Sequence, residues 1–209
     1  MRAKHKPTMT KAEREHVARL APQPCAVCDA LDKLESLYIH CLRPRLNGNQ
    51  RNDAKRAPIA LDALVQDGLL LVGHLLRRTS IAITQQLDSS RLVVGNKGEL
   101  QQVLINLLVN AIQAMPEGGV LTLSSEDWDE AGMPIGVRLS VSDTGPGIPP
   151  AHLDKLFQPF FTADKADGNG LGLWVSQGIV ERYGGNLTAA NRPEGGSCFT
   201  VWLRLEALG

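Results

Sequence analysis

The sequence predicts an α+β protein of the broad α/β class, a two-layer α/β sandwich of helices and mostly antiparallel strands. Segments with apolar residues at helical spacing are followed by shorter segments with the alternation of strands. Glycine pairs at 118–119, 184–185 and 195–196 end helices or separate strands. A chain of 209 residues with 43% hydrophobic content can bury one good core. We therefore expect one complete domain with at most a small appendage.

Charge and hydropathy exclude several classes of protein. Lysine plus arginine and aspartate plus glutamate both number 22, so no global field draws the chain to nucleic acid or to an acidic membrane. The longest apolar run, 59–76, contains Asp62, Asp67 and His74, which favours a core helix over a membrane span. No apolar segment follows the basic N-terminus, which argues against a secretory signal. We expect a cytoplasmic protein without a nucleic-acid partner.

The segment 1–57 is poorly specified. A short amphipathic helix is predicted at 30–41, and the polar run 47–56 is typical of a linker. Cys25, Cys28, His40 and Cys41 could supply four zinc ligands, but one cysteine pair without a well-spaced second pair favours ordinary free thiols. The main domain is expected to span 58–209.

The elements of the main domain follow in order. A helix is predicted at 61–77, a strand at 80–84 and a short strand at 92–94. The helix predicted at 99–115 is a core helix, because its apolar stripe is unbroken: Leu100, Val103, Leu104, Leu107, Leu108, Ala111, Ile112 and Met115.

The second half contains most of the predicted sheet. Strands at 120–123 and 137–141 form a hairpin across a loop at 126–136. A helix at 172–183 follows, and strands at 187–190 and 198–203 form the last pair. Cys198 is expected to be a buried thiol in this last strand.

Asn106 and Asn110 lie four residues apart, on one face of the predicted core helix. A buried amide without partners costs about 1–3 kcal/mol, so each needs a specific role. Carboxamide oxygens suit Mg²⁺ bound to phosphates. On the helix alone, amides that bond to neighbouring backbone are the simpler interpretation.

Asp143 ends a strand and enters a turn with two glycines, Gly145 and Gly147. Its carboxylate can accept a hydrogen bond from an exocyclic amine such as that of adenine, and the glycines permit close approach to a ring. A plain strand-ending turn is the alternative, since Asp, Gly and Pro are common there.

Gly168, Gly170 and Gly172 lead directly into the helix at 172–183. The bare amides of such a loop, with a helix N-terminus, form an anion site that suits triphosphate oxygens. No strand immediately precedes the loop, which argues against a dinucleotide-binding unit. Three phenylalanines precede it, at 157, 160 and 161; they form a small satellite core and could anchor a mobile lid.

These four motifs occur in the order 106–111, 143–148, 156–162 and 168–173. In this order they resemble the N, G1, F and G2 boxes of the catalytic ATP-binding domain of sensor histidine kinases. That domain belongs to the Bergerat-fold ATPases, which include gyrase, Hsp90 and MutL. The resemblance covers about 61–205. It implies a sheet with helices on one face, a mobile ATP lid, and ATP and Mg²⁺ as cofactors.

The resemblance also implies roles for individual residues. Asn110 would coordinate Mg²⁺, Asn106 would assist at the phosphates, and Asp143 would hold the adenine amino group. Lys165 matches a phosphate-binding lysine of the lid, although a solvated lysine is the alternative, and Ser197 matches a hydroxyl beside the aspartate. The remaining implied ATP contacts are Gly145, Gly147, Ile148, Phe157, Phe160, Thr162, Gly168, Gly170, Leu171, Gly172 and Leu173.

Asn106 bears on the reaction. The hydrolytic branches of the superfamily carry a glutamate four residues before the metal asparagine, and an amide cannot replace it as a general base. Slow hydrolysis and transfer to a protein acceptor are therefore favoured over efficient ATPase activity.

None of the five histidines fits the phosphoacceptor pattern of a histidine kinase, which has an acid immediately after the histidine and a proline five residues on. His74 is expected to be a partly buried structural residue. The leading prediction is a catalytic module that transfers the γ-phosphoryl group to a histidine on an acceptor domain, with a response regulator downstream and a homodimer as one expected assembly. The alternatives are an anti-sigma-type serine/threonine kinase and an ATP-gated interaction module, including a truncated or degraded kinase.

Overall fold

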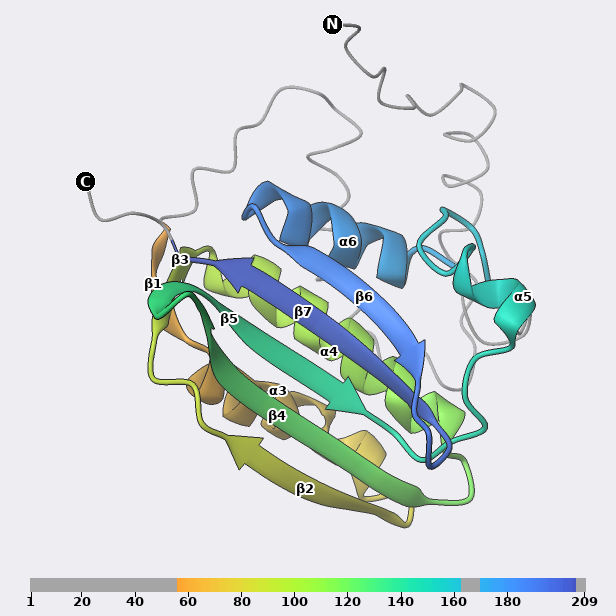
Figure 1. Ribbon diagram of the computed structural model, residues 1–209. Helices are drawn as coiled ribbons and strands as arrows, with labels where there is room; N and C mark the ends of the chain where they lie inside the picture. Colours follow the sequence, from red (N-terminus) through yellow and green to blue (C-terminus); the bar gives the residue numbers. More distant parts are fainter. Residues whose placement is uncertain (1–55, 163–169, 206–209) are drawn as a thin grey trace, which may run out of the picture. The chain divides into compact units, whose positions relative to one another are not determined.

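The computed structural model describes residues 56–162 and 170–205, which lie within one compact unit, Ala54–Gly209. A five-stranded sheet forms one layer, and helices packed against one face form the other (Figure 1). The predicted two-layer sandwich is confirmed. The helix predicted at 30–41 and the zinc ligands Cys25, Cys28, His40 and Cys41 lie outside the described residues.

The sheet has the strand order β2-β4-β5-β7-β6. Only β2 and β4 pair in parallel, and the other neighbours are antiparallel, so the sheet is mostly antiparallel as predicted. The strands are β2 (Ile81–Leu87), β4 (Gly119–Glu130), β5 (Met133–Ser142), β6 (Asn186–Asn191) and β7 (Ser197–Arg204).

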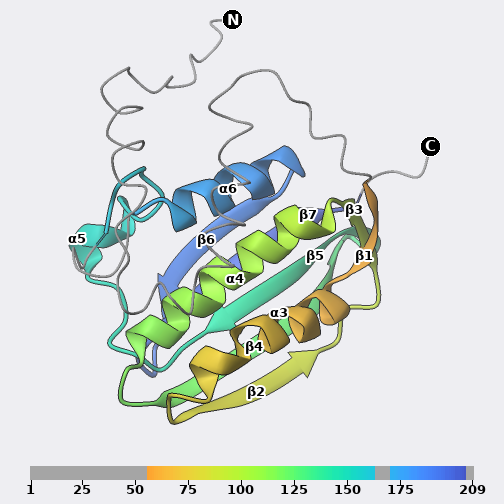
Figure 2. The ribbon, with the colours of Figure 1, turned by 180° about the vertical axis from the view of Figure 1, so that it is seen from behind.

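Three helices cover the sheet on the face seen in Figure 2: α3 (Leu61–Leu76), α4 (Lys97–Ala114) and α6 (Gly172–Arg182). The α4 helix packs between the other two, and its side chains Leu104, Leu107 and Leu108 are fully buried. Asn96 caps its start by accepting hydrogen bonds from two backbone amides. No helix of the described residues has the length and apolarity of a membrane span.

A small second sheet pairs β1 (Ala57–Ala60) with β3 (Leu92–Gly95) in antiparallel register. The short strand predicted at 92–94 is therefore confirmed, but β1 was not predicted. Ile59 pairs with Val93, and both side chains are buried. This pairing connects the start of the unit to the segment that precedes α4.

The predicted loop at 126–136 is wrong. Both strands of the hairpin continue through it, and only Ala131 and Gly132 form the turn, each with a positive φ. The end of this hairpin extends beyond the helical layer, so both faces of residues 128–134 are exposed. The alternation of apolar and polar residues that marks a half-buried strand is consequently missing there.

The prediction of a buried Cys198 is also wrong. Ser197, Phe199 and Val201 face the helices and are buried, whereas Cys198 lies on the opposite face of β7 and is partly exposed. Its Sγ atom is 3.7 Å from Oγ1 of Thr200 on the same face. The period of two along a strand decides this position.

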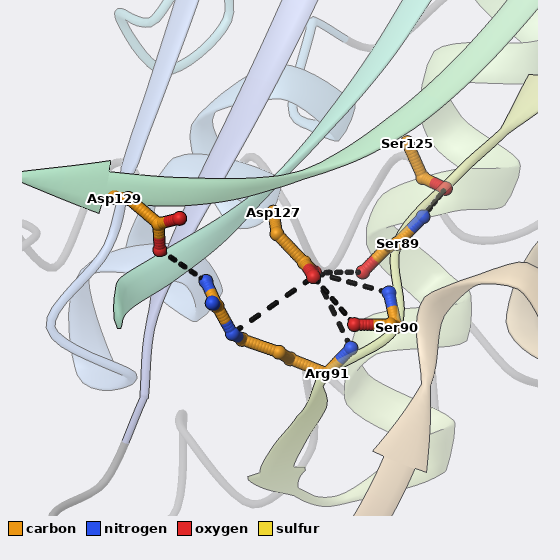
Figure 3. A network of polar contacts seen from close by, with 6 residues as sticks. All are labelled: Ser89, Ser90, Arg91, Ser125, Asp127 and Asp129. Atoms are coloured by element: carbon orange, nitrogen blue, oxygen red, sulfur yellow. Dashed lines mark hydrogen bonds and ion pairs between the residues drawn. The ribbon is translucent and has the colours of Figure 1, made fainter. Parts of the chain in front are cut away.

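Asp127 on β4 fixes the connection between β2 and β3 (Figure 3). Its Oδ1 atom accepts hydrogen bonds from the Ser89 hydroxyl at 3.1 Å, the Ser90 amide at 3.1 Å and the Arg91 amide at 3.3 Å. Its Oδ2 atom accepts from the Ser90 hydroxyl at 2.6 Å. Burial raises the pKa of Asp127, but the hydrogen bonds from Ser90 and Ser89 together lower it by more, so the pKa lies below its ordinary value.

We expect Asp127→Asn to flatten the acid dependence of stability. A carboxyl with a lowered pKa in the folded state stabilises the fold above its unfolded pKa of about 3.9, and this contribution is lost as the pH falls through the folded value. Urea unfolding between about pH 3 and pH 6 should show a smaller fall in the free energy of unfolding for the variant. An identical pH dependence of the two proteins would contradict this role.

Candidate nucleotide-binding site

One face of α4 carries Asn106, Asn110 and Ala114, each one turn beyond the last. Asn106 contacts the first residue of α6, Gly172. A Cβ atom on Gly145 would lie 2.7 Å from the carbonyl oxygen of Ala114, so the Asp143 turn lies directly against the end of the helix. Asn110 therefore lies between the Asp143 turn and the start of α6, about 6 Å along the helix axis from Asn106 and from Ala114.

Asn106 connects α4 to α6. Its Nδ2 atom donates to the carbonyl oxygen of Gly172 at 3.1 Å and to the Ser176 hydroxyl at 3.0 Å. Its Oδ1 atom accepts from Nε2 of Gln102 at 2.9 Å. Ser176 is fully buried and donates in turn to the carbonyl oxygen of Gly172 at 2.8 Å. Asn106 therefore bonds to neighbouring backbone, as in the simpler interpretation of the helix, and its role at phosphates stays a prediction.

Asn110 differs from Asn106. Its side chain is half-buried, and no described residue forms a hydrogen bond with its carboxamide. A polar group held on a rigid helix without a described partner fits a ligand-binding role better than a packing role.

Asp143 lies immediately after β5 and is 1% exposed. Its Oδ1 atom accepts from the amides of Gly145 at 2.8 Å and Ser197 at 3.2 Å. Its Oδ2 atom accepts from the Ser197 hydroxyl at 2.5 Å. The expected hydroxyl beside the aspartate is thus Ser197. Since a carboxylate offers about four acceptor positions, the described partners leave about one unused, on Oδ2.

Contacts within the protein, and not only a ligand, require glycine in the Asp143 turn. A Cβ atom on Gly147, which has φ +78°, would lie 2.9 Å from Oδ1 of Asn191. That Asn191 oxygen accepts from the amide of Ile148 at 2.6 Å, and its Nδ2 atom donates to the Ile148 carbonyl oxygen at 2.7 Å. The turn is consequently packed against β6.

The phenylalanine motif follows the short helix α5 (Pro150–Leu153), which lies near the start of α6 in Figures 1 and 2. The Phe160 amide donates to the Gly170 carbonyl oxygen at 3.0 Å, and a Cβ atom on Gly170 would lie 2.6 Å from the Phe160 carbonyl carbon. The Phe161 ring packs edge-on against His152 at 5.2 Å. The motif is therefore tied to Gly170, two residues before the start of α6. Phe157 and Thr162, which belong to the same motif, are partly buried.

The first turn of α6 begins at Gly172, after Leu171, without a side-chain cap. Three amides at the start of such a helix have no carbonyl partner within the helix, and the helix dipole favours an anion there. Leu171 is buried and Leu173 partly buried. Lys165 and Gly168 lie outside the described residues, as does the rest of the predicted lid at 163–169.

Comparison with known families matches residues 95–207, more than half of the chain, to the histidine kinase-, DNA gyrase B-, and HSP90-like ATPases. The matched span contains all four motifs. The chain belongs to this ATPase family. The resemblance to the catalytic domain of sensor histidine kinases is confirmed, and ATP is the nucleotide of the family.

The known relatives of this ATPase domain are longer proteins. The sensor histidine kinase ZraS of Escherichia coli (strain K12) is 35% identical over 187 residues, which cover 88% of this chain and 37% of ZraS. The chain thus spans little more than a third of the length of that relative.

Solved structures show the same fold. The catalytic domain of histidine kinase ThkA has 32% sequence identity and a TM-score of 0.64, covering 72% of this chain and 95% of the ThkA domain. ThkA in complex with the response regulator protein TrrA matches with 26% identity and a TM-score of 0.66, covering 92% of this chain and 56% of that chain.

Four residues that form hydrogen bonds with the predicted site residues were not themselves predicted from the sequence: Gln102, Ser176, Asn191 and Arg192. Gln102 precedes Asn106 by four residues, so helical spacing could have identified it. Ser176 follows Gly172 by four residues on α6 in the same way. No local pattern indicates Asn191 or Arg192, because their partners lie 43 and 49 residues away in the chain.

His74 and His152 are the histidines among the described residues. His74 lies on α3, partly buried, with Nδ1 3.2 Å from the Leu71 carbonyl oxygen, in agreement with the predicted structural role. His5, His16 and His40 lie outside the described residues.

Proposed function

We propose that this chain is the Mg-ATP-binding catalytic part of a two-component sensor histidine kinase. In this proposal the domain binds ATP and transfers its γ-phosphoryl group to a histidine of a phosphoacceptor domain. A nitrogen of the acceptor imidazole attacks the γ-phosphorus, the bond to the bridging oxygen breaks, and ADP leaves.

The observation that carries the proposal is the Asp143 carboxylate. It is almost fully buried, its described partners are neutral donors, and no ion pair with a described residue compensates its charge. Its unused acceptor position on Oδ2 suits one N–H of the adenine 6-amino group. Guanine carries a carbonyl oxygen at that position, so the same carboxylate disfavours it.

The predicted Mg²⁺ ligand, Asn110, fits this arrangement. Mg²⁺ binds few protein ligands and completes its octahedron with waters and phosphate oxygens, so one carboxamide between the base site and the start of α6 is sufficient. When bound, Mg²⁺ would neutralise charge on the phosphates. Asn110 would orient the ion, and the first amides of α6 would bind phosphate oxygens, together with Lys165 and the Gly168–Gly170 loop as proposed lid contacts.

Asn106 supports phosphoryl transfer over ATP hydrolysis. An amide has no basic lone pair for a water proton, and both polar atoms of this amide are already engaged with Gln102, Gly172 and Ser176. The acceptor histidine itself has no candidate in this part of the chain. ThkA binds a response regulator, and we propose that a response regulator receives the phosphoryl group from the acceptor here, in the cytoplasm where ATP is available.

Titration of the chain with AMPPNP, with and without Mg²⁺, tests the nucleotide site. Magnesium-dependent binding is expected, and no binding under either condition would overturn the proposal. Incubation with labelled ATP and histidine-containing acceptor domains then tests the reaction. Acid-labile label on the acceptor supports a histidine kinase, acid-stable label indicates a serine/threonine kinase, and binding without any labelling favours an interaction module.

We expect Asn110→Ala to weaken Mg-AMPPNP binding by about tenfold or more while the metal-free affinity changes little, because the variant loses a metal ligand and not a base contact. Calorimetric titration measures both affinities. Gln113→Ala is the matched control, since Gln113 is an exposed amide on the same helix. Equal affinities of the Asn110 variant and the control in the presence of Mg²⁺ would remove Asn110 from the metal site.

A further inference from the structure

We propose that Asn191 is a positioning residue for adenine recognition, with Arg192 in support, and that it acts by holding the backbone around Asp143. The inference rests on the proposed function, because it assigns a role in the binding of a base by Asp143. Neither residue belongs to the four sequence motifs.

Asn191 holds the far end of the Asp143 turn. It is the last residue of β6, and its side chain forms both a donated and an accepted hydrogen bond with the backbone of Ile148, at 2.7 Å and 2.6 Å. This pair of bonds imitates one step of strand pairing where no strand continues. Residues 143–149 have no helix or strand of their own, so these two bonds replace the missing backbone ladder.

The near end of the turn, at Asp143, is held by the hairpin that β6 forms with β7. The Arg192 guanidinium donates to the Asp143 carbonyl oxygen at 2.9 Å, while Ser197 binds the Asp143 carboxylate. Asn191 and Ser197 are register partners in the β6–β7 pair, so the two anchors lie side by side. The hairpin thus fixes Asp143 at one end and Ile148 at the other, and the segment between carries both glycines.

The position of Gly147 supports this reading. Its left-handed φ of +78° and the 2.9 Å approach of Asn191 Oδ1, an oxygen that accepts from the Ile148 amide, disfavour a side chain there. The backbone is therefore shaped around the Asn191 amide. Asn191 itself is exposed, so its removal deletes no core packing, and its effect should appear mainly in the orientation of the turn.

The experiment compares two ligands on wild-type protein and Asn191→Ala in the presence of Mg²⁺. One ligand is AMPPNP, and the other is its analogue with hydrogen in place of the 6-amino group. Wild-type protein should prefer AMPPNP. The variant should lose about tenfold in affinity for AMPPNP and distinctly less for the analogue, so the preference falls. Thr188→Ala, on the opposite face of β6, should leave both affinities unchanged.

Each remaining outcome is decisive. An unchanged preference in a folded Asn191→Ala variant, or an equal loss for both ligands accompanied by a lower Tm, would show a merely structural role and overturn the inference. If Asn191→Ala does not fold, Arg192→Ala, which removes the bond to the Asp143 carbonyl oxygen, must lower the preference instead. Wild-type protein that binds neither ligand, or binds both equally, would overturn the proposed adenine site and the inference with it.

Discussion

Asp143→Asn is expected to reduce the affinity for AMPPNP by about tenfold to hundredfold while the fold survives. The variant amide keeps one acceptor oxygen, which can replace Oδ1 and receive the Gly145 and Ser197 amides. Its NH₂ group then takes the place of Oδ2. The Ser197 hydroxyl can turn and accept from it, but the adenine amino group cannot, because two donors would face each other. Calorimetric titration with AMPPNP measures the loss.

Asp127→Asn provides the matched control for this prediction. Asp127 is also a carboxylate that accepts several hydrogen bonds, but it pairs with Val137, six residues before Asp143 along the neighbouring strand, about 20 Å away. It should alter stability without altering nucleotide affinity. A similar loss of affinity in both variants would mean that the effect of Asp143 is general destabilisation, and unchanged affinity in Asp143→Asn would remove it from the base site.

Gly196→Ala is expected to destabilise the domain by about 3 kcal/mol or more, and to weaken nucleotide binding as well. Gly196 has φ +84°, and an added Cβ atom would lie 2.0 Å from the Asp143 carbonyl oxygen. Backbone atoms cannot yield as a flexible side chain does, so either the hairpin or Asp143 must move. Urea unfolding gives the free energy change, and titration of the folded fraction with AMPPNP gives the change in affinity.

The same substitution at the adjacent glycine, Gly195, separates the effect of steric collision from that of backbone strain. Gly195 has φ +98°, but an added Cβ atom would have no neighbour within 4 Å. Gly195→Ala should therefore cost only the left-handed conformation, about 1–2 kcal/mol, and should retain nucleotide affinity. Equal destabilisation by the two substitutions would contradict a tight contact between Gly196 and Asp143.

Regular periodicity made much of the fold predictable. All eight apolar positions of the predicted helix at 99–115 are buried, from Leu100 to Met115, because a period of 3.6 places them on the one face that meets the sheet and the flanking helices. The helices predicted at 61–77 and 172–183 end within one residue of α3 and α6. The apolar face of each helix, and Gly184 and Gly185 after α6, are local signals.

The failures at 126–136 and at β1 come from the absence of such a local signal, whereas Cys198 was misassigned although the alternation along its strand is regular. The extended ends of β4 and β5 project beyond the helices, so no buried face imposes alternation on residues 128–134. Cys198 was placed in the core because its strand is a core strand, but its neighbours Ser197 and Phe199 occupy the buried face. β1 is only four residues long, and its partner β3 lies more than thirty residues later, so nothing local indicates it.

The sequence alone determined the kinds of chemical group and their order: two amides on a helix, a carboxylate at a strand end, a phenylalanine cluster and a glycine-rich loop before a helix. Only the tertiary structure decided which of these groups meet. Asp143 and Arg192 are 49 residues apart, Asn106 and Ser176 are 70 apart, and Asn191 and Ile148 are 43 apart. Local periodicity specifies which face of an element is buried, whereas such contacts depend on the order and register of all the strands, which form only when the whole core is packed.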